Sequence, residues 1–211
     1  MIENQRPTSP KGWYSRGYLP HFDGGEVWQF VTYRLYDSLP QNLLERWRLE
    51  LERDRITDAE FRRRIEQYLD QGCGSCFLRN ESVAEMIQEN LLNFDAQKYK
   101  LKAWVVMPNH VHLLLKPNAD FGLEEIMHSI KSYSAHEANK ILQRSGQFWF
   151  RESFDRYIRN HEHFQNTLAY IENNPVKARL CEKPSDWRFG SAYFRPGSAG
   201  GSPAMPPQDA S

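Results

Sequence analysis

Residues 104–116, WVVMPNHVHLLLK, carry two histidines within a run of aliphatic side chains. The apolar and β-branched residues on both sides of the Pro-Asn pair predict two strands joined by a tight turn. Residues two positions apart in a strand point to the same side of a sheet, so His110 and His112 share one face. Val111 and Leu113 face the other side, where they attach the strand to a core.

The segments around this hairpin predict an alternation of strands and helices. Aromatic and β-branched runs indicate strands, and apolar residues spaced three and four apart indicate helices. The expected strands cover residues 26–35, 99–107, 110–116 and 148–159, and the expected helices lie within 41–71, 81–94, 123–142 and 161–174. Pro175 is expected to end the last helix, because proline lacks the amide hydrogen that a helix interior uses.

This order of elements predicts an α+β protein. Without the two helices expected within residues 41–71, the order is strand, helix, strand, strand, helix, strand and a final helix. That is the split βαβ arrangement of the ferredoxin-like fold. We therefore expect an antiparallel sheet with helices packed on one face, two inserted helices and an additional C-terminal helix.

The length of 211 residues suits one domain with appendages. We expect this domain to cover residues 13–194, with residues 41–71 as a helical insertion whose dense charges are most simply a solvated face. Residues 1–12 and the Gly-, Pro- and Ser-rich segment 195–211 offer little to bury. We expect the first to be flexible and the second to be disordered.

The composition favours a folded protein outside the membrane. Charged residues make up 26% of the chain and the mean hydropathy is -0.73, and no apolar run approaches the roughly 20 residues of a spanning helix. The N-terminal residues lack the pattern of a signal or transit peptide, so we expect a cytoplasmic protein with no membrane partner. The formal net charge is zero, although residues 140–179 hold seven Lys and Arg against four Asp and Glu.

Two hypotheses fit the histidine pair. Two neutral imidazoles a few ångströms apart can bind one divalent cation. Alternatively, both are surface residues on an open sheet face, because short metal-like patterns recur by chance. A second pair, His161 and His163, falls at the predicted start of a helix, where residues two apart do not face each other. We expect those two to be helix caps or surface residues.

The predicted last helix carries Tyr170 and Asn174 four positions apart and therefore on one face. The Asn174 amide oxygen would add an oxygen ligand to the two imidazoles and leave positions for water or phosphate, which suits Mg²⁺ or Mn²⁺. Tyr170 would then lie beside the ion. The alternative fits the spacing equally well: Asn174 before Pro175 is typical of a helix N-cap, and Tyr170 of a core aromatic.

Three stretches in this order, VVMPNHVHLLL, RESFDRYIRN and AYIENNPVKA, resemble the REP-associated tyrosine transposases, relatives of the single-tyrosine HUH transposases of insertion sequences. The early FVTYRLYDSLP fits the same family, so the resemblance runs from about residue 26 to residue 187. It implies that Tyr170 is the nucleophile and that His110, His112 and Asn174 bind the metal. The chain departs from the family at Arg179, where members usually carry glycine, and this bears on the turn after the catalytic helix.

The resemblance also implies an activity: metal-dependent cleavage and joining of single-stranded or hairpin DNA through a covalent 5′-phosphotyrosine. A phenol with a pKa near 10 is a weak nucleophile at neutral pH, so its target phosphate must be polarised by a cation. A monomer and a homodimer both remain open. The DNA phosphates are expected to contact four cations, Lys131, Arg151, Arg156 and Arg159.

A non-catalytic nucleic-acid-binding module is the alternative function. RRM domains hold single strands on a four-stranded sheet with exposed aromatic residues. The consensus aromatic signature of RRM strands is absent from this chain. Binding that is insensitive to chelators, without cleavage under any metal, would favour this alternative.

Overall fold

The computed structural model describes residues 12–15 and 20–195. The two ends predicted to be flexible and disordered, 1–12 and 195–211, lie outside these residues except for Gly12 and Arg195. Within the described part of the chain, no helix combines the length and the apolar character needed to cross a membrane.

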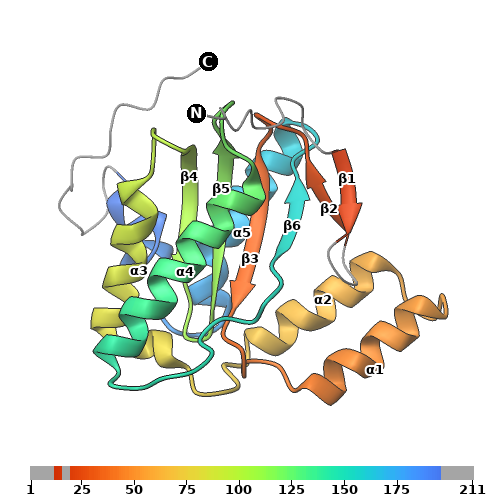
Figure 1. Cartoon of the computed structure of the whole chain (residues 1–211), viewed down its shortest axis with the longest axis horizontal. Coiled ribbons are helices and arrows are strands. Elements are labelled where there is room, and N and C mark those ends of the chain that lie inside the picture. Colours follow the sequence, from red (N-terminus) through yellow and green to blue (C-terminus); the bar gives the residue numbers. More distant parts are fainter. Residues whose placement is uncertain (1–11, 16–19, 196–211) are drawn as a thin grey trace, which may run out of the picture.

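A four-stranded antiparallel sheet lies at the centre of the fold (Figure 1). Its strands are β3 (Gln29–Arg34), β4 (Tyr99–Val106), β5 (His110–Pro117) and β6 (Phe154–Tyr157), arranged in the order β4-β5-β3-β6. Each crossover passes through a helix, and the hairpin β4-β5 turns at the Pro-Asn pair, as predicted. The structure confirms the α+β class with an antiparallel sheet.

Helices cover both faces of this sheet. Helices α3 (Glu81–Asn93) and α4 (Leu123–Ile141) pack on one face, and α5 (His161–Lys177) lies on the other (Figure 1). The larger apolar core lies under α3 and α4, and a smaller cluster lies under α5. The sheet therefore has no open face, unlike the RRM arrangement considered above.

The side chains of β5 alternate between the two faces of the sheet. Val111, Leu113 and Leu115 are buried in the core under α3 and α4. Leu114 lies in the cluster under α5, and by alternation His110 and His112 point to that same side. The predicted division of the strand into an apolar face and a histidine face is confirmed.

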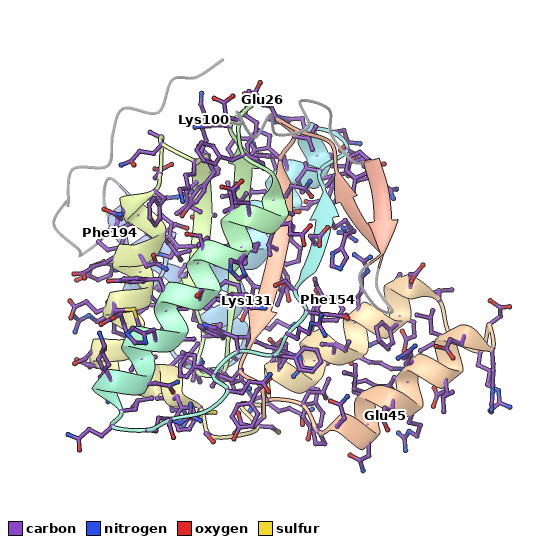
Figure 2. The ribbon with its side chains drawn as sticks, in the orientation of Figure 1. Glu26, Glu45, Lys100, Lys131, Phe154 and Phe194 are labelled. Atoms are coloured by element: carbon purple, nitrogen blue, oxygen red, sulfur yellow. The ribbon has the colours of Figure 1, made fainter. Side chains whose placement is uncertain are left out.

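The insertion between β3 and α3 forms the two predicted helices, α1 (Gln41–Glu52) and α2 (Asp58–Leu69). They pack on each other through their own apolar cluster, which consists of Leu39, Leu44, Trp47, Phe61, Ile65 and Leu69. Phe154 of β6 packs against this cluster and is labelled beside α2 in Figure 2. The insertion is thus attached to the β6 edge of the sheet.

A short N-terminal hairpin, β1 (Gly12–Ser15) and β2 (Pro20–Asp23), was not predicted. Its attachment to the sheet is a buried pair between His21 and the Asp155 carboxylate on β6, which also accepts from the Phe22 amide. Each strand has only four residues, and the two strands begin with Gly12 and Pro20. Their patterns are therefore too short to be detected in the sequence.

The end of α5 differs from the prediction. The helix does not stop at Pro175 but continues to Lys177, because a proline in the last turn removes only one hydrogen bond, the one to the Ile171 carbonyl. The chain then leaves through a Schellman motif: the Arg179 amide donates to the Val176 carbonyl at 2.9 Å and the Leu180 amide to the Pro175 carbonyl at 2.8 Å.

This motif needs a residue with positive φ, and Arg179 supplies it with a φ of 59°. The position where the sequence departs from the transposase pattern is therefore the position where glycine is conformationally favoured.

Candidate active site

His110 and His112 direct their Nε2 atoms at the same point under α5. The two Nε2 atoms are 3.1 Å apart, and both side chains are buried. The Nδ1 of His110 lies 2.7 Å from the Asn109 side-chain oxygen, and the Nδ1 of His112 lies 2.7 Å from the Thr32 hydroxyl. Because an amide oxygen only accepts, His110 carries its proton on Nδ1 and presents a lone pair at Nε2.

The electrostatics keep these imidazoles neutral. Burial lowers the pKa of His110 to about 3, with a smaller contribution from the positive charge of Lys177. Burial likewise lowers the pKa of His112, and His110 and Lys177 add to the effect. Neutral imidazole is the form in which histidine binds a metal.

Asn174 completes the group from α5. It is fully buried, and its Nδ2 lies 3.5 Å from the His112 Nε2, while its Oδ1 is buried without a hydrogen-bond partner. Rotation of the amide exchanges the two atoms and brings the unpaired oxygen to the imidazoles. Two nitrogens and one amide oxygen fit a divalent cation with open positions. Among residues 12–15 and 20–195, no three His, Cys, Asp or Glu side chains cluster as metal ligands.

Tyr170 lies one turn before Asn174, against the same histidines. Its ring centroid is 5.4 Å from that of His112 and 5.8 Å from that of Phe30 on β3. Its hydroxyl is buried and makes no hydrogen bond of ordinary geometry. Burial raises the pKa of Tyr170 above its ordinary value, and the carboxylates of Glu66 and Asp70 raise it further. The phenol is therefore protonated and close to the histidine pair.

Glu66 and Asp70 belong to α2 and its end, so the insertion reaches the site. Burial raises the pKa of Glu66, against the lowering effect of Lys177. Sequence analysis missed both residues, because it assigned the charges of 41–71 to a solvated face. Their spacing of four positions was visible, but nothing in the sequence indicated that this helix packs beside α5.

The predicted DNA-contacting cations lie in different places. Arg156 is exposed on β6, pairs with Phe30 across the sheet and so faces α5; its Nη2 lies 3.0 Å from the His163 Nε2. Arg159 is exposed just before α5, with its guanidinium 5.7 Å from the Tyr157 ring centroid. Arg151 is exposed in the loop between α4 and β6.

Lys131 is occupied elsewhere. It lies on α4 (Figure 2), across the sheet from α5 (Figure 1). Its ammonium donates to the carbonyls of Phe150 and Arg151 at 2.8 and 2.7 Å. These bonds hold the loop before β6. Trp149 in that loop is buried, and its indole donates to the Ser134 hydroxyl, so it is a core residue.

The second histidine pair differs in part from the prediction: His161 is a surface residue, whereas His163 is half-buried, and neither is the N-cap. His161 begins α5, and the Asn160 side chain caps the helix by accepting from the His163 amide at 2.8 Å. The two rings do not converge: Gln165 lies near His161, whereas His163 contacts Arg156 and accepts from the Arg159 amide.

A match to a known family covers His110, His112, Tyr170 and Asn174. Residues 77–174 match the family model described as "Transposase IS200 like". This segment contains the β4-β5 hairpin, α4, β6 and α5 as far as Asn174. The match confirms the resemblance to these transposases that the motifs indicated.

Two solved structures are similar to this chain. A REP-associated tyrosine transposase bound to a REP hairpin is 17% identical with a TM-score of 0.50, over 92% of this chain and 98% of that chain. A candidate transposase from Deinococcus radiodurans R1 is 18% identical with a TM-score of 0.41, over 76% of this chain and 96% of that chain. The first comparison shows a shared fold. No curated protein matches the chain.

Proposed function

We propose that this protein cleaves and rejoins single-stranded or hairpin DNA through a covalent bond between Tyr170 and a 5′ phosphate. The observation that carries the proposal is the convergence of a buried phenol, an unpaired amide oxygen and two neutral imidazoles. No core-packing role explains two unpaired polar atoms on one helix face, because burying a polar group without a partner costs about 1 to 3 kcal/mol. The match to the IS200-like transposase model supports the same chemistry.

The residues have distinct roles in this proposal. His110, His112 and Asn174 would hold Mg²⁺ or Mn²⁺, and such an ion would supply polarisation of the scissile phosphate. Thr32 and Asn109 orient the two imidazoles through Nδ1. With both imidazoles oriented in this way, the scissile phosphate would lie beside the Tyr170 oxygen.

In the proposed reaction, Tyr170 forms a bond to phosphorus while one bond in the DNA backbone breaks. Its oxygen attacks phosphorus, the bond from phosphorus to the 3′ oxygen breaks, and that oxygen takes up a proton from water as a free 3′-hydroxyl. The phenolic proton passes to Glu66, the carboxylate with the largest electrostatic influence on Tyr170. Because the phosphotyrosine conserves the bond energy, a 3′-hydroxyl of another strand reverses the step, and joining needs no ATP.

The DNA backbone is held by exposed cations. Arg156 and Arg159 lie near the start of α5, and Arg151 is exposed in the loop between α4 and β6. We leave Lys131 out of this set because its ammonium is bonded to the loop.

Incubation with hairpin oligonucleotides that carry single-stranded extensions, in the presence of Mn²⁺, tests the proposal. A covalent adduct is expected on a denaturing gel and should be absent with a chelator and in Tyr170→Phe. Tyr133→Phe is the matched control, since Tyr133 is exposed on α4 away from the site. An adduct that survives Tyr170→Phe would remove Tyr170 from this role.

A further inference from the structure

A cavity of about 280 Å³ lies between α2, the sheet and α5. The side chains that give it its chemistry are Arg62, Arg63, Phe154, Arg156, His163 and Tyr170. The Tyr170 ring contacts His112, and Tyr170 also lines this cavity. Helix α2 of the insertion forms the opposite wall of the cavity. Without α2, this side of Tyr170 would face solvent.

Three basic groups from three different elements meet at this cavity. Arg62 comes from α2, Arg156 from β6 and His163 from α5. Burial lowers the pKa of Arg62, and the nearby Arg156 adds to this effect by like-charge repulsion. Burial and the neighbouring arginines lower the pKa of His163, which favours its neutral form. A bound anion would relieve the repulsion between Arg62 and Arg156.

These arginines have few partners within the protein. Over residues 12–15 and 20–195, neither Arg62 nor Arg156 forms an ion pair, whereas Arg63 and Arg64 are both paired with Glu60. Arg62 makes only a long contact of 3.4 Å to the Asp155 carbonyl, and Arg156 contacts His163. Both guanidinium groups thus have donors left for a ligand.

Three acidic groups lie near these arginines. The Asp155 carboxylate is already bonded to His21 and to the Phe22 amide. Glu66 lines the same cavity, and its carboxylate interacts with both Arg62 and Arg156. Asp58 lies near Arg62 at the start of α2. Neither carboxylate forms an ion pair with these arginines within the described residues, so an anion is expected to lie between Arg62 and Arg156.

Part of the wall is apolar. Phe30 and Phe154 from the sheet and Ile65 and Leu69 from α2 supply this part, beside polar side chains that include Thr32 and Asn166. A half-buried aromatic ring beside guanidinium groups suits a nucleotide, whose base stacks while its phosphate is bound by arginine. The volume is near the lower limit of ligand sites, roughly 300 Å³, so the cavity fits one nucleotide and excludes a duplex.

We infer that the cavity between α2 and α5 binds one nucleotide of the single DNA strand next to the scissile phosphate, with its phosphate held by Arg62 and Arg156. This inference rests on the proposed function, and it gives the insertion of residues 41–71 a role: α2 supplies the second wall of the DNA-binding cleft. It predicts that DNA must be unpaired at this point to reach Tyr170.

Equilibrium binding of a fluorescent single-stranded oligonucleotide, with EDTA present so that no cleavage occurs, tests the inference. Arg62→Gln and Arg156→Gln should each weaken binding about fivefold or more, since each removes a charge-assisted contact. Each should also reduce the salt dependence by about 0.7 in the slope of log K against log salt. The matched control is Arg46→Gln on α1, whose side chain is 68% exposed; it should change binding less than twofold.

Two further measurements keep the outcomes separate. Arg62→Lys retains the charge but not the fork of donors, so it should bind between wild type and Arg62→Gln; it also serves if Arg62→Gln proves unstable. The double variant of Arg62 and Arg156 should lose less than the sum of the two single losses, because both contact one phosphate.

The inference and the proposed function fail differently. If wild type forms no adduct with Mn²⁺ but Arg62→Gln still weakens binding, nucleotide binding in the cavity is supported and the proposed cleavage reaction is contradicted. If wild type forms the adduct while Arg62→Gln and Arg62→Lys bind like Arg46→Gln, the cavity assignment is overturned. Failure of wild type to bind single-stranded DNA would overturn it as well.

Discussion

Lys177 on α5 donates to Asp70 at the end of α2, with 2.6 Å between Nζ and Oδ2, although 107 positions separate the two residues. The same ammonium lies 5.6 Å from the centroid of the Tyr170 ring. The Asp70 side chain is only 11% exposed, whereas that of Lys177 is 52% exposed. This contact fixes the insertion to the helix that carries the candidate nucleophile.

A double-mutant cycle of Asp70→Asn and Lys177→Met should reveal this link as a coupling of about 0.5 to 1 kcal/mol in the free energy of unfolding. The value is modest because Lys177 is half exposed and solvent screens the pair. Urea denaturation of the four proteins gives the coupling. The cycle for Arg48 and Glu52, an exposed pair within α1, is the comparison and should give a smaller coupling. Equal couplings would mean that Asp70 does not hold α5.

Arg179→Gly should stabilise the protein by about 0.5 to 1 kcal/mol. The left-handed backbone costs a residue with a Cβ about 1 kcal/mol or more, and the greater freedom of glycine in the unfolded chain offsets part of the gain. Arg179→Ala, which keeps the Cβ, controls for loss of the side chain and should show little gain. Chemical denaturation decides between them, and a glycine variant no more stable than the alanine variant would contradict the Schellman geometry.

Thr32→Val should weaken metal binding by about 10-fold or more, since partners that orient metal-binding histidines typically contribute 10- to 100-fold in affinity. Valine matches threonine in shape but cannot bond to the His112 Nδ1. The rise in melting temperature with increasing Mn²⁺ reports the affinity. In Thr167→Val the lost hydroxyl bonds only to the His163 carbonyl of the same helix, so that affinity should be unchanged. A Thr32 variant with the wild-type response would argue against a metal at His112.

The metal-free protein should lose stability as the pH falls from about 6.5 toward 3. The pKa of His110 is about 3 in the folded state and about 6.5 in an unfolded chain. Between these values the unfolded state binds the extra proton, so the free energy of unfolding decreases on acidification by up to about 1.4 kcal/mol per pH unit for such a group. Above pH 6.5 this contribution is complete and constant.

Urea unfolding with EDTA at several pH values measures this slope. His110→Gln should flatten it, whereas His136→Gln should not, because the His136 side chain is 70% exposed. An unchanged slope in His110→Gln would show that other groups cause the acid sensitivity.

Local pattern was enough to predict the β4-β5 hairpin, the two faces of β5 and the order of the elements. Period-two and period-3.6 patterns are properties of neighbouring residues, and they persist after folding. The pairing of Tyr170 with Asn174 followed from helix geometry alone. What joined these two residues to the histidines was the resemblance to a family, and their chemical roles are proposals.

The contribution of the insertion could not be predicted. The positions of Glu66, Asp70 and Arg62 beside α5 depend on how α2 docks, and docking is decided by contacts between residues about a hundred positions apart. The prediction that Pro175 ends the last helix was wrong for a related reason. The effect of a proline depends on how close the helix end lies, and the Schellman turn at Arg179 determines that end.

The small apolar cluster under α5, separate from the main core, implies two levels of cooperativity. Amide hydrogens of α5 should exchange with deuterium through local opening, well before those of β5, whose exposure requires global unfolding. The helix that bears Tyr170 can then detach briefly while the β-sheet remains intact. Such local opening would give a bulky polymer strand access to the Tyr170 hydroxyl, which is otherwise enclosed.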